Sequence, residues 1–304
     1  AGALTSDNES ALQFTETTGV RNDVSKSGRD LNQYIREDNL PPSKLTINAG
    51  GAVVIGGSAG KNKELSSINI TSSSTQVNGS WLKTAGVQNY SSALTINTSG
   101  DTKDVTIEGT TITVAGGVNV YGSDITLTSP IIISEASSNL IFKASGNISL
   151  NNVNSDITTN GGDVILWSNS GNISSGNENN DISLVDGVII NTDSSDSGNG
   201  GKIILAGGLD SSGSDGIPDG FAYKGDYSSI WGGVSIGKAN QVGTDGVSLL
   251  SGGGDILIRG RTGSSNTLPG IVSQGKFKID SGSGTIEMEG NSSEGHGIEL
   301  SYGV

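Results

Sequence analysis

Short apolar runs, separated by glycine and small polar residues, recur along most of the chain. A typical run is an apolar–polar–apolar triplet such as Ile125-Thr126-Leu127 or Ile148-Ser149-Leu150, which places both apolar side chains on one face of a β-strand. Many runs follow Gly-Asn or Gly-Asp, as in Gly146-Asn147-Ile148, Gly162-Asp163-Val164 and Gly254-Asp255-Ile256. Apolar runs bounded by Gly, Asn and Ser predict strands and turns, and their repetition predicts a stack of coils.

The spacing of the runs predicts how many strands form one coil. Three successive runs span roughly 22 to 25 residues in the middle of the chain, a period typical of a single solenoid coil. Val118, Leu140 and Val164 are nearly in register at this interval, and so are Ile125 and Ile148. We therefore predict an all-β fold, a right-handed parallel β-helix (a β-solenoid) with about three short strands per coil and roughly eleven coils. A β-sandwich would use longer strands, and a propeller would repeat at about 40 to 50 residues.

The pattern divides the chain into four segments. The first segment lacks the glycine-and-strand unit, carries mixed charges and is predicted to be an N-terminal cap or lead-in. The last segment repeats Gly254-Asp255-Ile256-Leu257-Ile258 as Gly284-Thr285-Ile286-Glu287-Met288, which predicts wider coils with a longer excursion. Both chain ends resemble cuts in a longer polypeptide. The predicted segments are the cap at 1–44, a regular β-helix at 45–209, an irregular acidic insertion at 210–228 and a continuation with wider coils at 229–304.

Composition and charge restrict the partners. The 304 residues include 48 Gly and no Cys, so thiolate and disulfide chemistry are excluded. The formal net charge of −14 disfavours nucleic acid, because phosphate binding needs a cationic surface, but it leaves room for divalent cations. No stretch approaches the roughly 18 consecutive apolar residues that suggest a membrane span.

Several phrases resemble a known group of proteins. The phrases are Thr159-Asn160-Gly161-Gly162-Asp163-Val164-Ile165-Leu166-Trp167-Ser168, Gly171-Asn172-Ile173, Gly200-Gly201-Lys202-Ile203-Ile204-Leu205-Ala206-Gly207-Gly208 and Ser281-Gly282-Ser283-Gly284-Thr285-Ile286-Glu287-Met288-Glu289-Gly290. They are similar to the β-helical shaft of filamentous-haemagglutinin-like exoproteins, the large adhesins of Gram-negative bacteria. The resemblance covers roughly Leu45 to the C-terminus and implies a secreted protein at the cell surface, outside the outer membrane. The chain departs from the two-partner-secretion members in lacking a recognisable secretion domain.

The resemblance also implies a function. It implies a non-enzymatic segment of a large exported adhesin that serves as a rigid shaft and an extended contact surface. Its partners would be the surface of a host or neighbouring cell, glycans or other surface material, and other parts of the same large protein. Two alternatives stay open: a carbohydrate-active β-helix enzyme (polysaccharide lyase or hydrolase), and a purely structural fibre component.

An acidic stretch at residues 210–220 is the most specific candidate for a ligand-binding motif in the sequence. It resembles the calcium loops of thrombospondin type 3 repeats, and this resemblance implies Asp210, Asp215 and Asp219 as calcium ligands. In an EF-hand-like register Asp215 and Asp219 take the fifth and ninth loop positions, whereas the first and third positions lack carboxylates. The competing interpretation is a solvated Asp-rich turn between coils. A melting temperature that does not change with calcium or chelator would decide against the metal. No other cofactor is predicted.

Carboxylates for sugar chemistry are a second candidate site. Such chemistry needs carboxylates together on one face, usually with basic and aromatic groups that hold the sugar. The candidates are Glu178, Asp186, Asp193 and Asp196. Because Asp193 and Asp196 lie in a stretch rich in Ser and Asn, solvated loop acids are the favoured interpretation.

A Ser-His-Asp triad could use only His296, the single histidine. Ser58, in Gly56-Gly57-Ser58-Ala59-Gly60, matches the nucleophile elbow by letter, but no helix is predicted after it. A turn serine and a surface histidine are therefore the favoured interpretation.

Aromatic residues and threonines offer two further candidate surfaces. Aromatic residues favour core or coil-edge packing over a sugar-stacking patch; they are Trp81, Trp167, Trp231, Tyr223 and Tyr227. A threonine array like that of ice-binding solenoids is predicted to be broken, because the matched positions change to Asn119, Thr126, Ile132 and Ser149. Asn147 and Asn172, at recurring turns, predict a stacked amide ladder at a coil corner.

Overall fold

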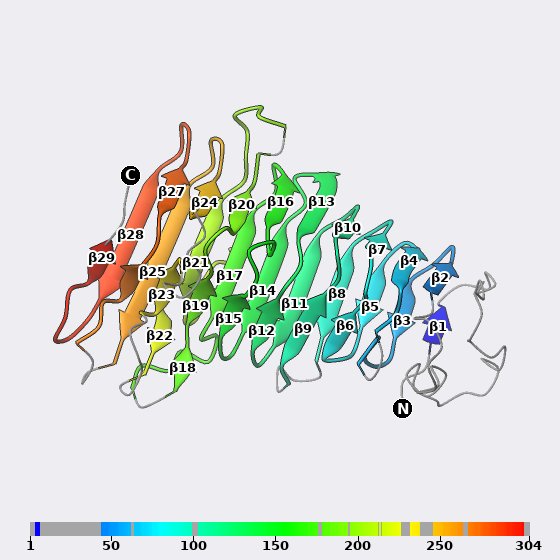
Figure 1. Ribbon diagram of the computed structural model, residues 1–304, viewed down its shortest axis with the longest axis horizontal. Helices are drawn as coiled ribbons and strands as arrows, with labels where there is room; N and C mark the ends of the chain where they lie inside the picture. The colour runs from blue at the N-terminus through cyan, green and yellow to red at the C-terminus, as the bar shows by residue number, and fades with distance from the viewer. Residues whose placement is uncertain are drawn as a thin grey trace.

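The strands of the chain wind into a rod of stacked coils (Figure 1). The computed structural model describes residues 4–6, 44–61, 64–98, 103–175, 178–193, 195–211, 213, 215–225, 232–237, 246–263 and 267–300. All helix and strand assignments in these ranges are β-strand. The predicted all-β parallel β-helix with about three strands per coil is therefore confirmed.

Three sheets form the sides of the rod. Sheet A has twelve strands in the order β1 (Leu4–Ser6), β3 (Val53–Ile55), β5 (Thr75–Val77), β8 (Leu94–Asn97), β11 (Val118–Gly122), β14 (Leu140–Ala144), β17 (Val164–Ser168), β21 (Ile203–Gly207), β25 (Ile256–Thr262), β22 (Ala222–Lys224) and β18 (Asn179–Asn180), with β28 (Ile286–Asn291) paired to β25. Sheet B has nine strands: β2 (Lys44–Asn48), β4 (Ser67–Thr71), β7 (Gln88–Tyr90), β10 (Ile112–Val114), β13 (Ile131–Ala136), β16 (Ile157–Asn160), β20 (Ile189–Asn191), β24 (Val247–Leu250) and β27 (Phe277–Asp280). Sheet C has eight strands: β6 (Trp81–Lys83), β9 (Val105–Glu108), β12 (Ile125–Leu127), β15 (Ile148–Leu150), β19 (Ile182–Leu184), β23 (Val234–Ile236), β26 (Ile271–Ser273) and β29 (Ile298–Leu300).

The chain visits the sheets in the order B, A, C and then returns to B one layer further along the rod. Val118 pairs with Leu140, Leu140 with Val164, and Ile125 with Ile148, as the spacing predicts. All strand pairs are parallel except β1 with β3 and β18 with β22. Sheet B has nine layers in the described residues instead of the predicted eleven or so, because the later coils are longer than the early ones.

The coils widen earlier than the sequence predicts. Ile148 pairs with Ile182, and Val164 pairs with Ile203, so long corner loops already separate these layers before residue 210. Further on, Ile256 pairs with Ile286, so the repeated runs lie in adjacent layers. Strand β22 lies inside the predicted insertion 210–228 but belongs to sheet A, where it pairs with β25. The predicted cap at 1–44 falls largely outside the described residues.

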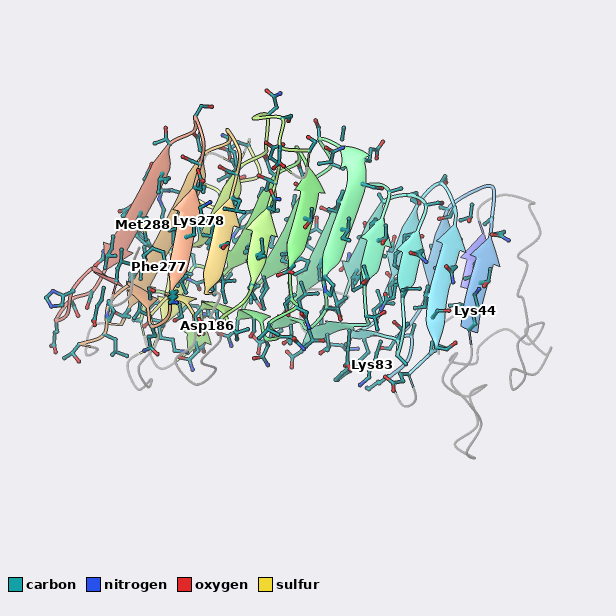
Figure 2. All side chains as sticks on the ribbon, turned by 45° about the horizontal axis from the view of Figure 1, so that its top comes forward. Lys44, Lys83, Asp186, Phe277, Lys278 and Met288 are labelled. Atoms are coloured by element: carbon teal, nitrogen blue, oxygen red, sulfur yellow. The ribbon has the colours of Figure 1, made fainter. Side chains whose placement is uncertain are left out.

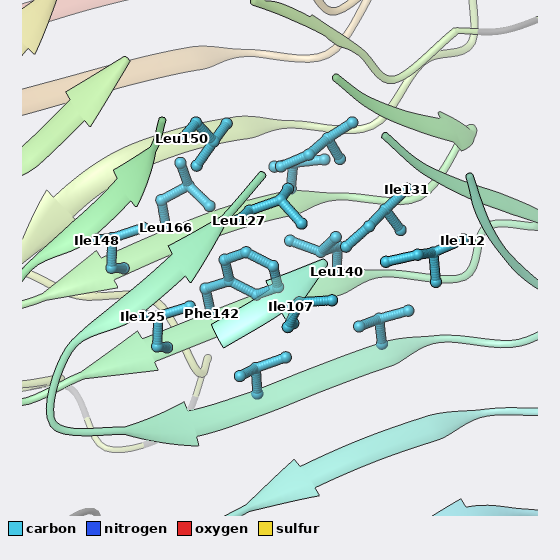
Figure 3. Packing of buried hydrophobic residues seen from close by; sticks show 14 of the residues in the cluster. Ile107, Ile112, Ile125, Leu127, Ile131, Leu140, Phe142, Ile148, Leu150 and Leu166 are labelled. Carbon is cyan, nitrogen blue, oxygen red and sulfur yellow. The ribbon is translucent and has the colours of Figure 1, made fainter. Parts of the chain in front are cut away.

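A narrow column of aliphatic side chains fills the rod. Inward and outward positions alternate along each strand, so that Leu140 and Phe142 are fully buried while Ile141 between them points outward. Figure 3 shows Phe142 among aliphatic side chains of neighbouring layers. Each layer adds only a few inward residues, which explains how a chain with 32% hydrophobic residues forms a continuous core.

One buried polar pair interrupts this core. Gln88 and Tyr90 point inward from β7. The Tyr90 hydroxyl donates to Gln88 Oε1 at 2.9 Å, and Gln88 Nε2 donates to the Glu108 carbonyl at 2.9 Å. Both side chains are therefore hydrogen-bonded, as buried polar groups must be to avoid a desolvation cost.

The recurring Gly-Asn or Gly-Asp phrase lies at the corners of the rod. At these corners an Asn or Asp oxygen accepts the backbone N–H of the equivalent residue one layer on: Asp124 Oδ1 from Asn147 at 2.7 Å, Asn147 Oδ1 from Asp181 at 3.0 Å, and Asp163 Oδ1 from Lys202 at 2.7 Å. Asn147 thus forms a ladder, but one between side chain and backbone and not the predicted amide-to-amide stack. Asn172 does not join it, because it lies in a turn with φ 56 and donates its N–H to the Asn169 carbonyl.

The glycine of the phrase leaves room for the neighbouring layer. A Cβ on Gly201 would lie 2.3 Å from the carbonyl carbon of Gly162. A Cβ on Gly254 would lie 2.2 Å from the Gly201 oxygen, and one on Gly284 would lie 2.2 Å from the Gly254 oxygen. These four residues, Gly162, Gly201, Gly254 and Gly284, form a column at the corner between sheets B and A that we call the glycine column.

Candidate functional site

An apolar cluster lies on the outer face of sheet A, where the coils widen. Its members are Ile165, Trp167, Ile204 and Ala206, with Ile141, Ile217 and Leu257 packed against them. The loop at 208–221, which we call the acidic loop, returns over this face and contributes Ile217. Trp167 is only 6% exposed. Its Nε1 donates to the Gly208 carbonyl at 2.7 Å, and the Lys143 ammonium lies 3.8 Å from its ring centroid. Trp167 is therefore packed and is not available for sugar stacking.

The aspartates of the acidic loop hold its backbone. Each carboxylate accepts backbone N–H groups from within the loop: Asp210 Oδ1 from Gly213 at 2.6 Å, Asp215 Oδ1 from Ile217 at 3.1 Å, and Asp219 Oδ2 from Ser211 at 2.7 Å. In the described part of the chain, no group of three or more His, Cys, Asp or Glu is placed to hold a metal ion. Calcium binding by Asp210, Asp215 and Asp219 stays a prediction.

A buried asparagine joins the acidic loop to the rod. Asn169 adopts φ 51 and is fully buried. Its Nδ2 donates to the carbonyls of Ile173 and Phe221 at 3.0 and 3.1 Å, and its Oδ1 accepts from the Asn180 amide at 3.2 Å. Asn169 therefore connects the turn after β17 to both β18 and the end of the acidic loop. The sequence signal for this role was the cluster Asn169-Ser170-Gly171-Asn172, since Asn and Gly tolerate positive φ.

Charged groups are buried beside this asparagine. The Lys224 ammonium lies 3.2 Å from Asp181 Oδ1, and both side chains are about nine-tenths buried. Burial raises the pKa of Asp181, and the Lys224 charge offsets part of that rise. The Arg261 guanidinium lies 5.6 Å from the ring centroids of both Phe221 and Tyr223. We call this set, with Asn169, the junction cluster; it fixes a protrusion to the rod.

The carboxylates proposed for sugar chemistry lie at three different corners. Glu178 precedes β18 at the corner from sheet A to sheet C, and Asp186 lies between β19 and β20 at the corner from C to B. Asp193 and Asp196 lie between β20 and β21 at the corner from B to A. The chain therefore does not place these four carboxylates on one face.

Asp193 has a structural role in its loop. Its oxygens accept from the N–H groups of Ser197 and Gly198 at 2.9 and 2.7 Å and from the hydroxyls of Ser195 and Ser197. Burial opposes ionisation of Asp193, but these donors outweigh it and hold its pKa below the ordinary value. A carboxylate stabilised in this way is a poor general acid.

Asp186 differs from Asp193, because its surroundings raise its pKa instead of lowering it. Its Oδ1 is buried without a hydrogen-bond partner, and it packs against the backbone at Gly237 and Gly275 (Figure 2 labels Asp186). Burial raises its pKa above the ordinary 3.8.

We expect Asp186 to make the protein less stable as the pH rises. The folded state binds the Asp186 proton more tightly than the unfolded state, so its contribution is fully present below pH 3.8 and is lost as the pH rises through the raised pKa. Denaturant unfolding of the wild type and Asp186→Asn at a series of pH values from about 3 to 7 tests this. The unfolding free energy of Asp186→Asn, relative to that of the wild type, should increase as the pH rises. A relative unfolding free energy that does not change with pH would contradict the raised pKa of Asp186.

Ser58 and His296 lie at opposite ends of the rod. Ser58 follows β3 in the first layer of the coil, whereas His296 precedes β29 in the last. The Ser58 hydroxyl oxygen accepts the N–H of Ser80 at 3.1 Å, which gives it a turn-forming role. No triad can form from this pair.

The remaining aromatic candidates do not form one patch. Trp81 lies on sheet C, Trp167 is packed on sheet A, and Tyr223 is buried. Trp231 and Tyr227 lie outside the described residues.

Polar rows run along the outer faces of the rod. The positions compared for a threonine array lie on three different sheets: Asn119 on A, Ile132 on B, and Thr126 and Ser149 on C. Within sheet C an unbroken hydroxyl row exists, because Thr106, Thr126, Ser149 and Ser183 pair in register. On sheet B, a shallow depression crosses four layers; its lining residues are Asn69, Thr71, Asn89, Ser91, Thr113 and Ser134, together with Ile70, Tyr90 and Ala115.

No protein-family model matches the chain, and no curated protein or solved structure matches it. In the described residues, no helix has the length and hydropathy of a membrane-spanning segment.

Proposed function

We propose that the chain is a non-enzymatic segment of a large exported bacterial adhesin of the filamentous-haemagglutinin-like kind, acting as a rigid shaft and an extended contact surface. The observation that carries the proposal is the repetition of uncharged polar groups on successive layers of one rod. The hydroxyl row on sheet C and the lined depression on sheet B each cross four layers.

Repetition makes weak contacts useful. Parallel strands in one sheet lie about 4.8 Å apart, so each row presents equivalent groups at a fixed interval along the rod. A partner that repeats along its own length, such as a surface glycan, can engage several layers at once, and linked weak contacts raise the overall affinity. The loops held by the junction cluster and by Asp193 project from this surface.

Binding of the purified chain to bacterial and host cells and to a glycan array tests the proposal. We expect saturable binding that Asn69→Ala, Asn89→Ala and Thr113→Ala together reduce by about tenfold or more, because they remove contacts from three layers. The matched control is Gln76→Ala, Thr95→Ala and Asn119→Ala, which truncates the same number of outward groups in register on sheet A. Equal loss in this control would contradict a contact surface on sheet B, and absence of binding would favour the purely structural fibre.

The alternative function, that of a carbohydrate-active enzyme, is tested by a separate assay. Incubation with neutral and acidic polysaccharides, followed by measurement of reducing ends and unsaturated products, should give no turnover. Product formation that survives further purification would overturn the non-enzymatic proposal.

A further inference from the structure

An antiparallel strand pair at the junction cluster brings a lysine and an aspartate together. β18 pairs with β22, so that Asn179 lies opposite Lys224 and Asn180 lies opposite Tyr223 (Figure 1). Asp181 follows β18 directly and is two residues on from Asn179, the partner of Lys224. Residues two positions apart on a strand point to the same face. Lys224 and Asp181 are therefore diagonal neighbours across the pair, a separation that a long side chain can span.

The two side chains meet out of contact with water. Lys224 Nζ lies 3.2 Å from Asp181 Oδ1, and only 10% and 11% of the two side chains are exposed. The backbone is fixed on both sides, because Lys224 pairs in register with Thr262 on β25 and the Asp181 N–H donates to Asn147 Oδ1 at 3.0 Å. Neighbouring layers of the rod therefore hold the amine beside the carboxyl group.

Burial makes this ion pair costly. Moving an ammonium and a carboxylate out of water costs free energy that their mutual attraction does not always return. Burial is the largest influence on the pKa of Asp181 and raises it, which favours the protonated acid. The exposed pair between Lys83 and Glu108 differs, because its side chains are 30% and 36% exposed and water solvates both charges. A neutral amide at the buried position would carry no charge to desolvate.

We propose that Lys224 and Asp181 form an intramolecular isopeptide bond, a covalent cross-link between Lys224 Nζ and Asp181 Cγ. One proton first moves from the ammonium to the carboxylate, which leaves a neutral amine and a carboxylic acid. The amine lone pair then forms the C–N bond at Cγ. The bond from Cγ to the hydroxyl oxygen breaks with its electrons on the oxygen, which takes a second proton from the nitrogen and leaves as water. The products are one amide and one water molecule, so the step needs no oxidant, reductant or co-reactant.

The fold supplies what this reaction needs. Holding two groups in contact converts an unfavourable encounter into an intramolecular step with a high effective concentration, and exclusion of water opposes the reverse hydrolysis. The cross-link joins residues 43 positions apart in sequence and closes a loop that contains β19, β20, β21 and the acidic loop. Like a disulfide, it would restrict the unfolded chain, in a protein that has no cysteine.

Intact-mass spectrometry of the purified and denatured chain tests the proposal. We expect a mass that is lower than that of the sequence by one water molecule. Proteolysis should give one branched peptide that joins the segments around Asp181 and Lys224. Lys224→Arg keeps the positive charge but removes the amine that forms the bond, so the mass of this variant should equal that of its sequence. Asp181→Ala removes the carboxyl group and should also abolish the deficit.

The matched control is Lys83→Arg, which alters the exposed pair with Glu108 and should keep the full deficit. Loss of water from an aspartate that precedes glycine, such as Asp186, also lowers the mass, but it leaves linear peptides and persists in Lys224→Arg. Circular dichroism checks that Lys224→Arg is folded; if it is not, the presence or absence of the branched wild-type peptide decides alone. Two results would overturn the proposal: a wild-type chain with the full mass of its sequence, or a deficit that persists in Lys224→Arg.

Discussion

Replacing Phe142 by alanine is expected to lower the free energy of unfolding by about 3–5 kcal/mol. Phe142 is fully buried at the centre of β14 and lies in register with Val120 below it and Leu166 above it. The substitution removes a ring from a column with little freedom to collapse, because the strand ladders on three sides fix the width of the rod. The lost burial and the remaining cavity both reduce stability.

Guanidinium unfolding followed by circular dichroism measures the effect of Phe142→Ala. The matched control is Asn119→Ala on β11, an outward position one layer away, for which a change within about 0.5 kcal/mol is expected. Since each coil contacts only its neighbours, the Phe142→Ala transition should also broaden as the two halves of the rod lose their coupling. A loss below about 1 kcal/mol would mean that the ring does not sit in the coil interior.

The repeat in the sequence predicts the fold well, because a parallel ladder converts spacing directly into register. Val118, Leu140 and Val164 pair as their spacing predicts. Three strands have too few aliphatic residues for the apolar–polar–apolar pattern to predict them: Thr75-Gln76-Val77, Trp81-Leu82-Lys83 and Gln88-Asn89-Tyr90. In β7 the inward positions are Gln88 and Tyr90, whose hydrogen bonds form only once the neighbouring layer is in place, so a hydrophobic pattern cannot show them.

The covered face of sheet A has a signal in the sequence. Val164-Ile165-Leu166-Trp167 and Ile203-Ile204-Leu205-Ala206 are apolar at every position, a pattern that indicates strands buried on both faces. That pattern predicts a cover, and the acidic loop supplies it through Ile217. The junction cluster is harder to foresee, because Asn169 and Phe221 are far apart in sequence and meet only when two corner loops converge.

Surface rows also depend on knowing the sheet to which a residue belongs. Thr126 and Ser149 are neighbours on sheet C, but Asn119 and Ile132, which lie close to Thr126 in sequence, face other directions. Comparing all four residues makes the hydroxyl row seem broken, although it is continuous within one sheet. Corner loops of unequal length shift the sequence spacing from layer to layer, so only the three-dimensional register shows which residues share a face.

Substitution of Gly201 by alanine is expected to destabilise the rod by about 1–3 kcal/mol, and the same change at Gly171 is expected to have the opposite sign. Neither glycine has a positive φ, so backbone conformation does not separate them. A Cβ on Gly201 would lie 2.3 Å from the Gly162 carbonyl carbon and 2.6 Å from the Asp163 nitrogen, both backbone atoms that cannot rotate away. At Gly171 a Cβ would meet nothing within 4 Å.

The clash at Gly201 acts on the corner ladder as well as on packing. Separating the layers at this point lengthens the 2.7 Å hydrogen bond from the Lys202 N–H to Asp163 Oδ1, so two contacts weaken together. At Gly171, alanine reduces the freedom of the unfolded chain without a folded-state penalty, which stabilises a protein by about 0.4–1 kcal/mol. Denaturant unfolding of both variants beside the wild type decides the point. Equal effects at the two positions would show that the glycine column does not limit the distance between layers, and that glycine is placed at these corners for backbone freedom alone.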